Sequence, residues 1–418
     1  MKRKYWISLL ILSSLLISAL LAGCASNTAT TSNPQNTTDS KAGKELKIGA
    51  IMPVTGPAAE KGKPGIDALL DSIEYVNKEL GGADGYQIKL DWKDSAYNAA
   101  NVTTIITDFT NSGVLMFTAM SSFEMTNAMG ISNKAGLPGL AIFTSPNLYN
   151  PPVHIYGQVP DYADSWVAFA NYYMKNIWKG TGKPKMALHL LNNPTGTSVK
   201  DAAVVKAAGM GIDLVEIQEH AATTISEKDS LTRIKSKNPD VLFISSTPQP
   251  TSIILKNARD LGMSPQTMTI GMAYASFTKS LIDLAGKDVT EGIYGVYPTV
   301  TWEDNIPGVA KAREYLMKNN PADAGNMDYL MVWCTGLISA EILKNAVQAV
   351  GYEKLAKGGA EAWKAVEESG FKKLNYDVAG IQGAVSYTPG DNRLAKYIKI
   401  YTVKNGIITP IGDWVSTR

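Results

Sequence analysis

The chain has 418 residues, of which 45% are hydrophobic, 19% charged and 8% aromatic. This length suggests two or three domains, and the composition excludes wholesale disorder and a multi-span membrane protein. The formal net charge is +2, but without the three basic residues at 2–4 the remaining 37 Lys and Arg face 38 Asp and Glu. Such a balance provides no basic surface for nucleic acid, and two cysteines, Cys24 and Cys334, exclude a disulfide framework and a Cys-rich zinc site.

The first segment has the features of an export signal. Basic residues at 2–4 precede an apolar run from Tyr5 to Ala22, which ends in Leu21-Ala22-Gly23-Cys24. This order is typical of a secretory signal. Its ending resembles a bacterial lipobox, which implies that residues 1–23 are removed and that Cys24 is lipidated. The alternative is a transmembrane anchor with an incidental cysteine.

The next stretch, residues 25–44, is rich in Ser, Thr, Asn and Gln and has almost no apolar residues. Such a composition predicts a flexible tether. Several acyl chains on Cys24 would hold the protein on a membrane, because one chain alone binds only marginally. We therefore expect a protein that acts outside the cytoplasmic membrane, either on the cell surface or in a periplasm.

From Leu46 the chain alternates between short apolar strands and amphipathic helices. Pro64 suits the first turn of a helix that Gly81-Gly82 ends. This alternation is typical of βαβ units around a parallel sheet. The first series has expected strands at 46–52, 86–92, 114–118 and 139–143, and expected helices at 64–80, 98–111 and from about Ser122.

The series restarts after residue 160, which predicts a second lobe of similar size. Its expected strands are 186–191, 213–218, 241–245 and 267–271, and its expected helices are 164–178, 197–209, 227–237 and 251–261. The remaining tail is too small for a third domain, so we expect it to complete both lobes. This predicts lobe I from 45–160 plus about 294–383, and lobe II from 161–293 plus about 384–418. The chain would then cross between the lobes more than once.

The order of signal, lipobox, polar tether and K-I-G-A-I-M-P-V-T-G-P (47–57) before a long helix resembles the type I solute-binding lipoproteins of ABC importers. The similarity is greatest to receptors for branched-chain amino acids (Leu/Ile/Val) and amides. Further matching segments are 81–90, 238–241, 258–262 and 380–383. The resemblance implies an α/β fold of two Rossmann-like lobes, joined by three crossings, that close on a ligand in the cleft.

Polar residues follow two expected strands of the first lobe, at the sheet edge where open α/β folds bind ligands. Ser121 or Ser122 could cap the next helix, whose free N–H groups form an anion site. Ser145 and Asn147 follow the next strand. The resemblance implies that these two loops hold a ligand carboxylate. The alternative is that the serines only cap helices.

Matching loops of the second lobe contain Thr195, Thr247 and Tyr274. The alternative for each is an ordinary surface turn. Lys61 falls where the family often has an aromatic lid residue, and either pairs with an anionic ligand or remains solvated. Met120, like Tyr274, could form an apolar wall of the site or belong to the core.

One departure from the family pattern bears on the ligand. Amino-acid receptors of this group have a carboxylate in the third loop of the second lobe, where this chain has Ala273 beside Tyr274 and no acid nearby in the sequence. A desolvated ammonium without a counter-charge is costly. Thr195 and Thr247 also replace the usual aromatic residues. We therefore expect an organic acid, with aromatic acids included, rather than an α-amino acid; the next alternative is a neutral amide or urea-like solute.

Catalytic signatures are missing from the sequence. It has no G-x-S-x-G or H-E-x-x-H, and its three histidines, His154, His189 and His220, are isolated from one another along the chain. We expect no enzyme, no cofactor and no metal. The leading hypothesis is a monomeric receptor that captures a small solute and delivers it to a membrane permease. The alternative is a sensory receptor for an amide, a urea-like compound or a branched-chain amino acid, coupled to signalling.

Overall fold

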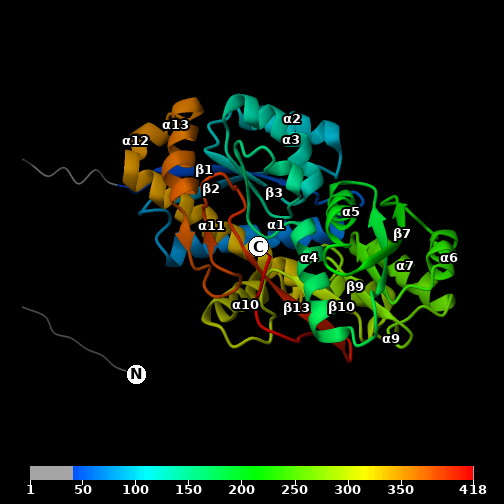
Figure 1. The fold of residues 1–418 in the computed structure, drawn as a ribbon. Coiled ribbons are helices and arrows are strands. Elements are labelled where there is room, and N and C mark those ends of the chain that lie inside the picture. Colours follow the sequence, from blue (N-terminus) through cyan, green and yellow to red (C-terminus); the bar gives the residue numbers. More distant parts are fainter. Residues whose placement is uncertain (1–40, 418) are drawn as a thin grey trace, which may run out of the picture. The chain divides into compact units, whose positions relative to one another are not determined.

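The computed structural model describes residues 41–417 (Figure 1). The expected signal (1–23), Cys24 and most of the tether lie outside the described residues. The last four tether residues are described, and two of them contact the folded body. Lys41 Nζ lies 2.9 Å from Asp84 Oδ2, and Lys44 Nζ lies 3.0 Å from Glu353 Oε1.

The first sheet is built from the first apolar runs and is entirely parallel, in the order β2-β1-β3-β4-β5. Its central strands are buried along most of their length, as expected when helices cover both faces. Its elements are β1 (Glu45–Met52), α1 (Ala59–Glu79), β2 (Gln87–Asp94), α2 (Ala99–Phe109), β3 (Met116–Ala119), α3 (Ser122–Ala135), β4 (Gly139–Ala141), η1 (Pro146–Leu148) and β5 (Ile155–Gly157).

The start of α1 differs from the sequence expectation. The helix begins at Ala59, so Pro64 is its sixth residue and not part of its first turn. Proline has no N–H, so this helix lacks one internal hydrogen bond. The earlier start has a consequence for the site, because it places Lys61 on the helix and buries it.

Packing of α2 on the first sheet depends on a glycine in β1. A Cβ at Gly49 would lie 2.6 Å from the Phe109 ring. No side chain fits there, and this close approach lets the Phe109 ring reach the sheet.

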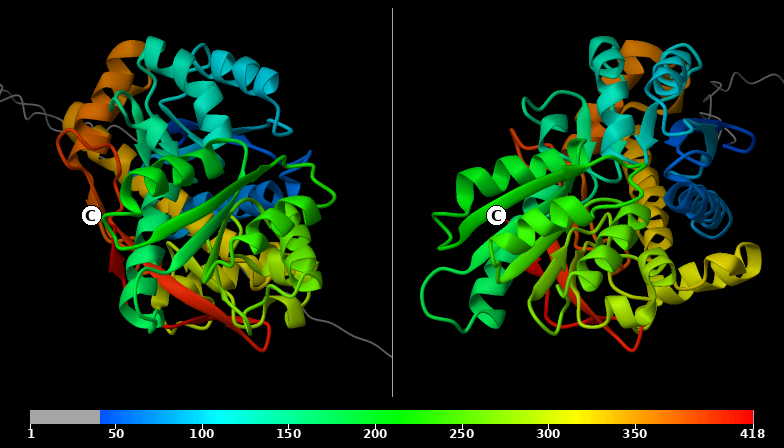
Figure 2. Two further views of the ribbon diagram at one scale, coloured as in Figure 1. Left: turned by 45° about the vertical axis from the view of Figure 1, so that its right-hand side comes forward. Right: turned by 90° about the vertical axis from the view of Figure 1, so that its right-hand side faces the viewer.

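The second sheet has the order β14-β13-β10-β9-β8-β6-β7, with β15 paired to β13. Strands β6 to β10 are parallel, and β13 runs antiparallel to β10. Figure 2 shows the red C-terminal strands beside the green and yellow strands of this sheet. Its elements are α4 (Tyr162–Tyr172), the π-turn η2 (Tyr173–Ile177), β6 (Lys185–Leu191), α5 (Pro194–Lys206), β7 (Asp213–His220), α6 (Lys228–Ser236), β8 (Val241–Ser245), α7 (Pro248–Asp260), β9 (Thr269–Met272), α8 (Lys279–Ala285), α9 (Lys287–Thr290), β10 (Tyr294–Tyr297), β13 (Tyr397–Lys404), β14 (Ile407–Pro410) and β15 (Val415–Ser416).

The strand at 294–297 corrects the expected division of the tail. We expected residues from about 294 onward to complete the first lobe, but β10 pairs with β9 and β13 in the second sheet. The reason is local: Tyr294 aligns with Gly271 in parallel register, so this apolar strand completes the second sheet before the chain crosses back.

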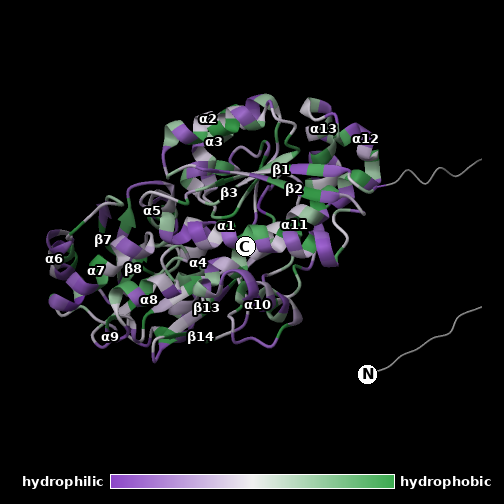
Figure 3. Cartoon of the chain, turned by 180° about the vertical axis from the view of Figure 1, so that it is seen from behind, coloured by the Kyte–Doolittle hydropathy of each residue, from purple (hydrophilic) through white to green (hydrophobic). Residues whose placement is uncertain are grey.

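The tail between the two groups of second-sheet strands packs on the first lobe, mainly through α11 against α1. Among the described residues, α11 is the one helix long and apolar enough to span a membrane, yet 83% of its apolar window is buried inside the protein. It is therefore a core helix, and Figure 3 contrasts it with the hydrophilic α6. The tail elements are α10 (Pro307–Asn319), η3 (Pro321–Asp323), α11 (Met327–Val350), α12 (Tyr352–Leu355), α13 (Gly359–Ala365), η4 (Val366–Gly370), η5 (Phe371–Lys373), β11 (Asn375–Tyr376) and β12 (Val385–Ser386).

The chain passes between the two sheets three times, and the crossings are joined to one another. Gln158 of the first crossing donates to Gln382 Oε1 over 3.1 Å, and Thr299 of the second forms a bridge with the same Gln382. Arg393 of the third forms a bridge with Gly157. The lobes are thus connected by three chain crossings that contact one another through isolated bridges and a hydrogen bond, and three crossings are what the sequence resemblance implied.

Candidate functional site

The start of α3 lies at the carboxyl end of β3, the edge of a parallel sheet at which open α/β folds bind ligands. Ser121 is the N-cap: its Oγ accepts from Glu124 N over 3.2 Å, and Glu124 Oε2 accepts from Ser121 N over 3.0 Å. Ser121 therefore caps α3. The Ser122 hydroxyl is fully buried and makes no well-formed hydrogen bond within the protein, and its polar neighbour is the hydroxyl of Tyr162.

The electrostatics of this helix start depend on Glu124. Burial raises the pKa of Glu124 to about 8, although hydrogen bonds with Ser95 and Ser121 oppose the shift. The carboxyl group is therefore mostly protonated at neutral pH. Because the helix start is not neutralised by its own acid, it can still attract an anion.

Tyr97 reaches this site from the turn after β2, and the sequence analysis did not identify it. The turn holds Ala96 and Tyr97 in the left-handed region, at φ of 49° and 54°. Asp94 Oδ1 supports it by accepting from Ala96 N over 2.8 Å, and Ser95 Oγ accepts from Tyr97 N over 3.1 Å. Asn193 Nδ2 of the second lobe donates to the Tyr97 hydroxyl over 3.2 Å. The sequence signal that could have identified Tyr97 is an aromatic residue just after β2.

Tyr274 contacts the first lobe from the loop after β9. Its ring stacks on Phe143 with centroids 5.4 Å apart and on Tyr162 with centroids 4.8 Å apart. Its hydroxyl accepts from Thr144 N over 3.4 Å. The strand-end loops of the two lobes are therefore in contact, and their interface is rich in tyrosine.

Lys61 is the cation of this interface. Its Nζ lies 2.7 Å from Asp328 Oδ2 and 3.1 Å from the carbonyl oxygen of Ala275, and the residue is 5% exposed. The alternative of a solvated lysine is wrong. The sequence around Tyr274 has no acid, but Asp328 of α11 lies close to Ala275 in space, because the Lys61 ammonium group contacts both. Asp328 lies in the first turn of α11, where acidic residues are common because they favour the helix start, so the sequence did not indicate that it pairs with Lys61.

Two further predicted residues lie among these side chains, and three lie elsewhere. Thr195 is buried, with its hydroxyl beside that of Tyr162. Ser145 is buried after β4, where its Oγ donates to Asn147 Oδ1 over 2.5 Å. Asn147 itself is exposed and lines a groove of about 530 Å³ on the flank of α5, together with Asp161, Asp164 and Arg393. Met120 is buried against Gly65 of α1, which agrees with the core alternative, and the half-buried Thr247 is the N-cap of α7 without a side-chain capping bond.

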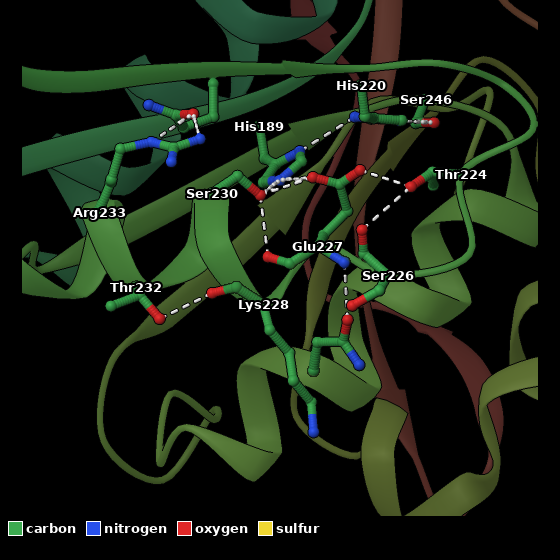
Figure 4. A network of polar contacts seen from close by, with 12 residues as sticks. His189, His220, Thr224, Ser226, Glu227, Lys228, Ser230, Thr232, Arg233 and Ser246 are labelled. Atoms are coloured by element: carbon green, nitrogen blue, oxygen red, sulfur yellow. Dashed lines mark hydrogen bonds and ion pairs between the residues drawn. The ribbon is translucent and has the colours of Figure 1, made fainter.

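A buried polar network lies in the second lobe (Figure 4). His189 Nδ1 lies 3.0 Å from His220 Nδ1, and the other ring nitrogens contact Ser230 and Ser246 over 2.9 and 2.7 Å. Glu227 Oε2 lies 3.3 Å from His189 Nε2. The two histidines that are isolated in the sequence are thus adjacent in space. Within residues 41–417 no group of three or more His, Cys, Asp or Glu could hold a metal.

Comparison with known proteins agrees with this architecture. The family model described as periplasmic binding protein matches residues 45–406. A Leu/Ile/Val-binding protein homolog 7 of Brucella melitensis is 24% identical over 298 residues, which are 68% of this chain and 69% of the relative.

Two solved structures illustrate the range of ligands among proteins of this fold. A branched-chain amino acid ABC transporter protein from Thermus thermophilus with bound valine superposes with a TM-score of 0.78 at 18% identity, over 89% of this chain and 97% of that one. A solute-binding protein from R. palustris in complex with 4-hydroxybenzoate has a TM-score of 0.73 at 15% identity, over 89% and 96%. These matches show a type I periplasmic binding protein fold. The chain therefore belongs to the periplasmic binding protein family, whose members are non-enzymatic, extracytoplasmic solute receptors of ABC importers.

Proposed function

We propose that this receptor captures a small organic acid, with aromatic acids included, and delivers it to a membrane permease. The observation that carries the ligand class is the buried Ser122 hydroxyl, which lacks a well-formed hydrogen bond at the start of α3. A carboxylate at this position would accept from Ser122 and from first-turn N–H groups. The mostly protonated Glu124 adds no repelling charge at neutral pH.

The side chains around this position suit a ring. Tyr97, Phe143, Tyr162 and Tyr274 surround the contact between the lobes, and ring stacking is worth about 0.5–1.5 kcal/mol per pair beyond burial. The R. palustris protein that binds 4-hydroxybenzoate supports an aromatic acid as one member of the ligand class. The proposed contact residues from the sequence are Ser121, Ser122, Ser145, Thr195, Tyr274 and Lys61, and Tyr97 joins them.

The proposed receptor works from a membrane anchor as a monomer. Its support is the lipobox-like Leu21-Ala22-Gly23-Cys24 and the polar stretch after it. The tether would leave the two lobes free to close at the bilayer surface.

The test is ligand identification followed by a variant. Mass spectrometry of small molecules released from the purified protein identifies the native cargo. A thermal-shift panel then compares 4-hydroxybenzoate, 3-phenylpropanoate, 4-methylpentanoate, their amides, leucine and valine, because a ligand selective for the folded protein raises its Tm. We expect the carboxylates to stabilise the protein.

The variant Ser122→Ala should lose at least tenfold in affinity for the stabilising acid, because one hydrogen bond to a charged group is worth about 1.5–3 kcal/mol. Ser132→Ala is the matched control, since Ser132 is equally buried at the far end of α3. It should leave the affinity unchanged. Stabilisation by leucine or valine alone, or by the amides alone, contradicts the proposal.

A further inference from the structure

The Lys61 ammonium group is enclosed by three kinds of group that bind ammonium ions. Asp328 Oδ2 provides a carboxylate at 2.7 Å, the Ala275 carbonyl accepts over 3.1 Å, and the Phe143 ring centroid lies 4.6 Å from Nζ. An aromatic face attracts a desolvated cation, and charge-assisted hydrogen bonds are the stronger ones. Lys61 and Asp328 are both buried, so little water competes for these contacts.

Two further polar groups lie beside the pair formed by Lys61 and Asp328. The Tyr297 hydroxyl also donates to Asp328, from β10 of the second sheet. Glu60 lies next to Lys61 on α1, and its Oε1 is buried without a hydrogen bond. Burial raises the pKa of Glu60, while the neighbouring Lys61 lowers it and Asp328 raises it. Asp328 is therefore the acid that pairs with Lys61, and the Glu60 carboxyl group lies beside this pair.

We infer that Asp328, the Ala275 carbonyl and the Phe143 ring form an ammonium-binding site that Lys61 fills, so that this receptor selects against ligands carrying an ammonium group. The inference deepens the proposed function and rests on it for the natural ligand. A ligand ammonium entering here would have to displace Lys61, which would leave a buried lysine without a counter-charge.

Both lobes contribute to this site. Lys61 and Asp328 come from α1 and α11, which pack together in the first lobe, whereas Ala275 and Tyr297 belong to the second. The ammonium group of a bound amine would contact both lobes at this site. The Lys61 ammonium group, which belongs to the chain itself, makes these contacts instead.

Chemical rescue tests the site without any assumption about the natural ligand. Lys61→Ala removes three methylenes and the ammonium, a group that propylammonium replaces. In about 100 mM propylammonium chloride, the Tm of Lys61→Ala should rise by about 2 °C or more above its value in the same concentration of sodium chloride. The wild type and Lys63→Ala, which changes an exposed lysine of the same helix, should show no such rise.

A second substitution keeps the test decisive. Asp328→Asn in the Lys61→Ala background should abolish the rescue. If Lys61→Ala does not fold, recovery of its far-UV circular dichroism in propylammonium becomes the readout, with the same expectation. Absence of rescue by either measure overturns the inference.

Ligand selectivity is the third measurement. Leucine and 4-methylpentanoate differ only by an ammonium group, as do phenylalanine and 3-phenylpropanoate. Lys61→Met should shift the ratio of amino-acid to acid affinity at least tenfold toward the amino acid, and Lys63→Met should not. Rescue without binding of any acid would refute the proposed function but keep the ammonium site, whereas an unchanged ratio in Lys61→Met would refute the selectivity.

Discussion

Replacing Glu124 by Gln should remove a pH dependence of stability that the buried carboxyl imposes. Burial raises its pKa from 4.5 to about 8. The folded state therefore holds a proton that the unfolded chain releases from pH 4.5 upward. The stability associated with this proton is complete below pH 4.5 and is lost as the pH rises to about 8.

The magnitude follows from the size of that shift. Each pKa unit corresponds to about 1.4 kcal/mol, so the shift amounts to about 5 kcal/mol between pH 4.5 and 8. Glu124→Gln keeps the shape of the side chain and cannot ionise. The free energy of unfolding of the variant relative to the wild type should thus increase by about 1.4 kcal/mol per pH unit over that interval.

Urea unfolding at pH 5, 6, 7 and 8, followed by tryptophan fluorescence, measures this difference. Other titrating groups are common to both proteins and cancel. Glu361→Gln, at an exposed position of α13, serves as the control for the loss of a carboxyl group from the surface. A pH-independent difference for Glu124→Gln would refute the reasoning, because it would mean that the carboxyl ionises in the folded protein as it does in water.

Three other perturbations test separate features. Burial beside His189 lowers the pKa of His220 from 6.5 to about 3. The stability associated with the neutral imidazole is therefore complete above pH 6.5 and falls as the pH drops toward 3. His220→Gln should remove this loss when urea unfolding is measured between pH 6.5 and pH 3. Gly49→Ala should reduce the unfolding free energy by about 1–3 kcal/mol, since its Cβ would meet Phe109 at 2.6 Å, and an unchanged urea midpoint would argue against the packing of α2. Cys24→Ser should move the protein from the membrane pellet to the soluble fraction, and continued sedimentation would contradict lipidation at that residue.

The alternation of strands and helices was predictable because apolar runs and turn residues are local signals. Strand β8 (Val241–Ser245) was expected at the residues where it occurs. The start of α1 was missed because Pro64 is a favoured first-turn residue, yet the helix accommodates it in its interior. β10 was assigned to the wrong lobe because the strands with which a strand pairs depend on the whole fold and not on its local sequence.

The spatial pairs of the candidate site were not predictable from spacing. Lys61 and Asp328 are 267 residues apart, and their contact depends on how α11 packs on α1. The pairing of His189 with His220 depends on the parallel register of β6 and β7, in which His189 aligns with Gln218 and Leu191 with His220. Periodicity identifies the strands but not this alignment. The start of α3 was predictable, because its serines follow a strand and precede a helix.

The placement of β13 (Tyr397–Lys404) between β10 and β14 has a consequence for biosynthesis. The second lobe cannot finish its sheet until residues 397–410 have been synthesised, because β13 and β14 follow β6 to β10 in the chain. A nascent chain that lacks them presents β10 as an open edge, which is prone to aggregate.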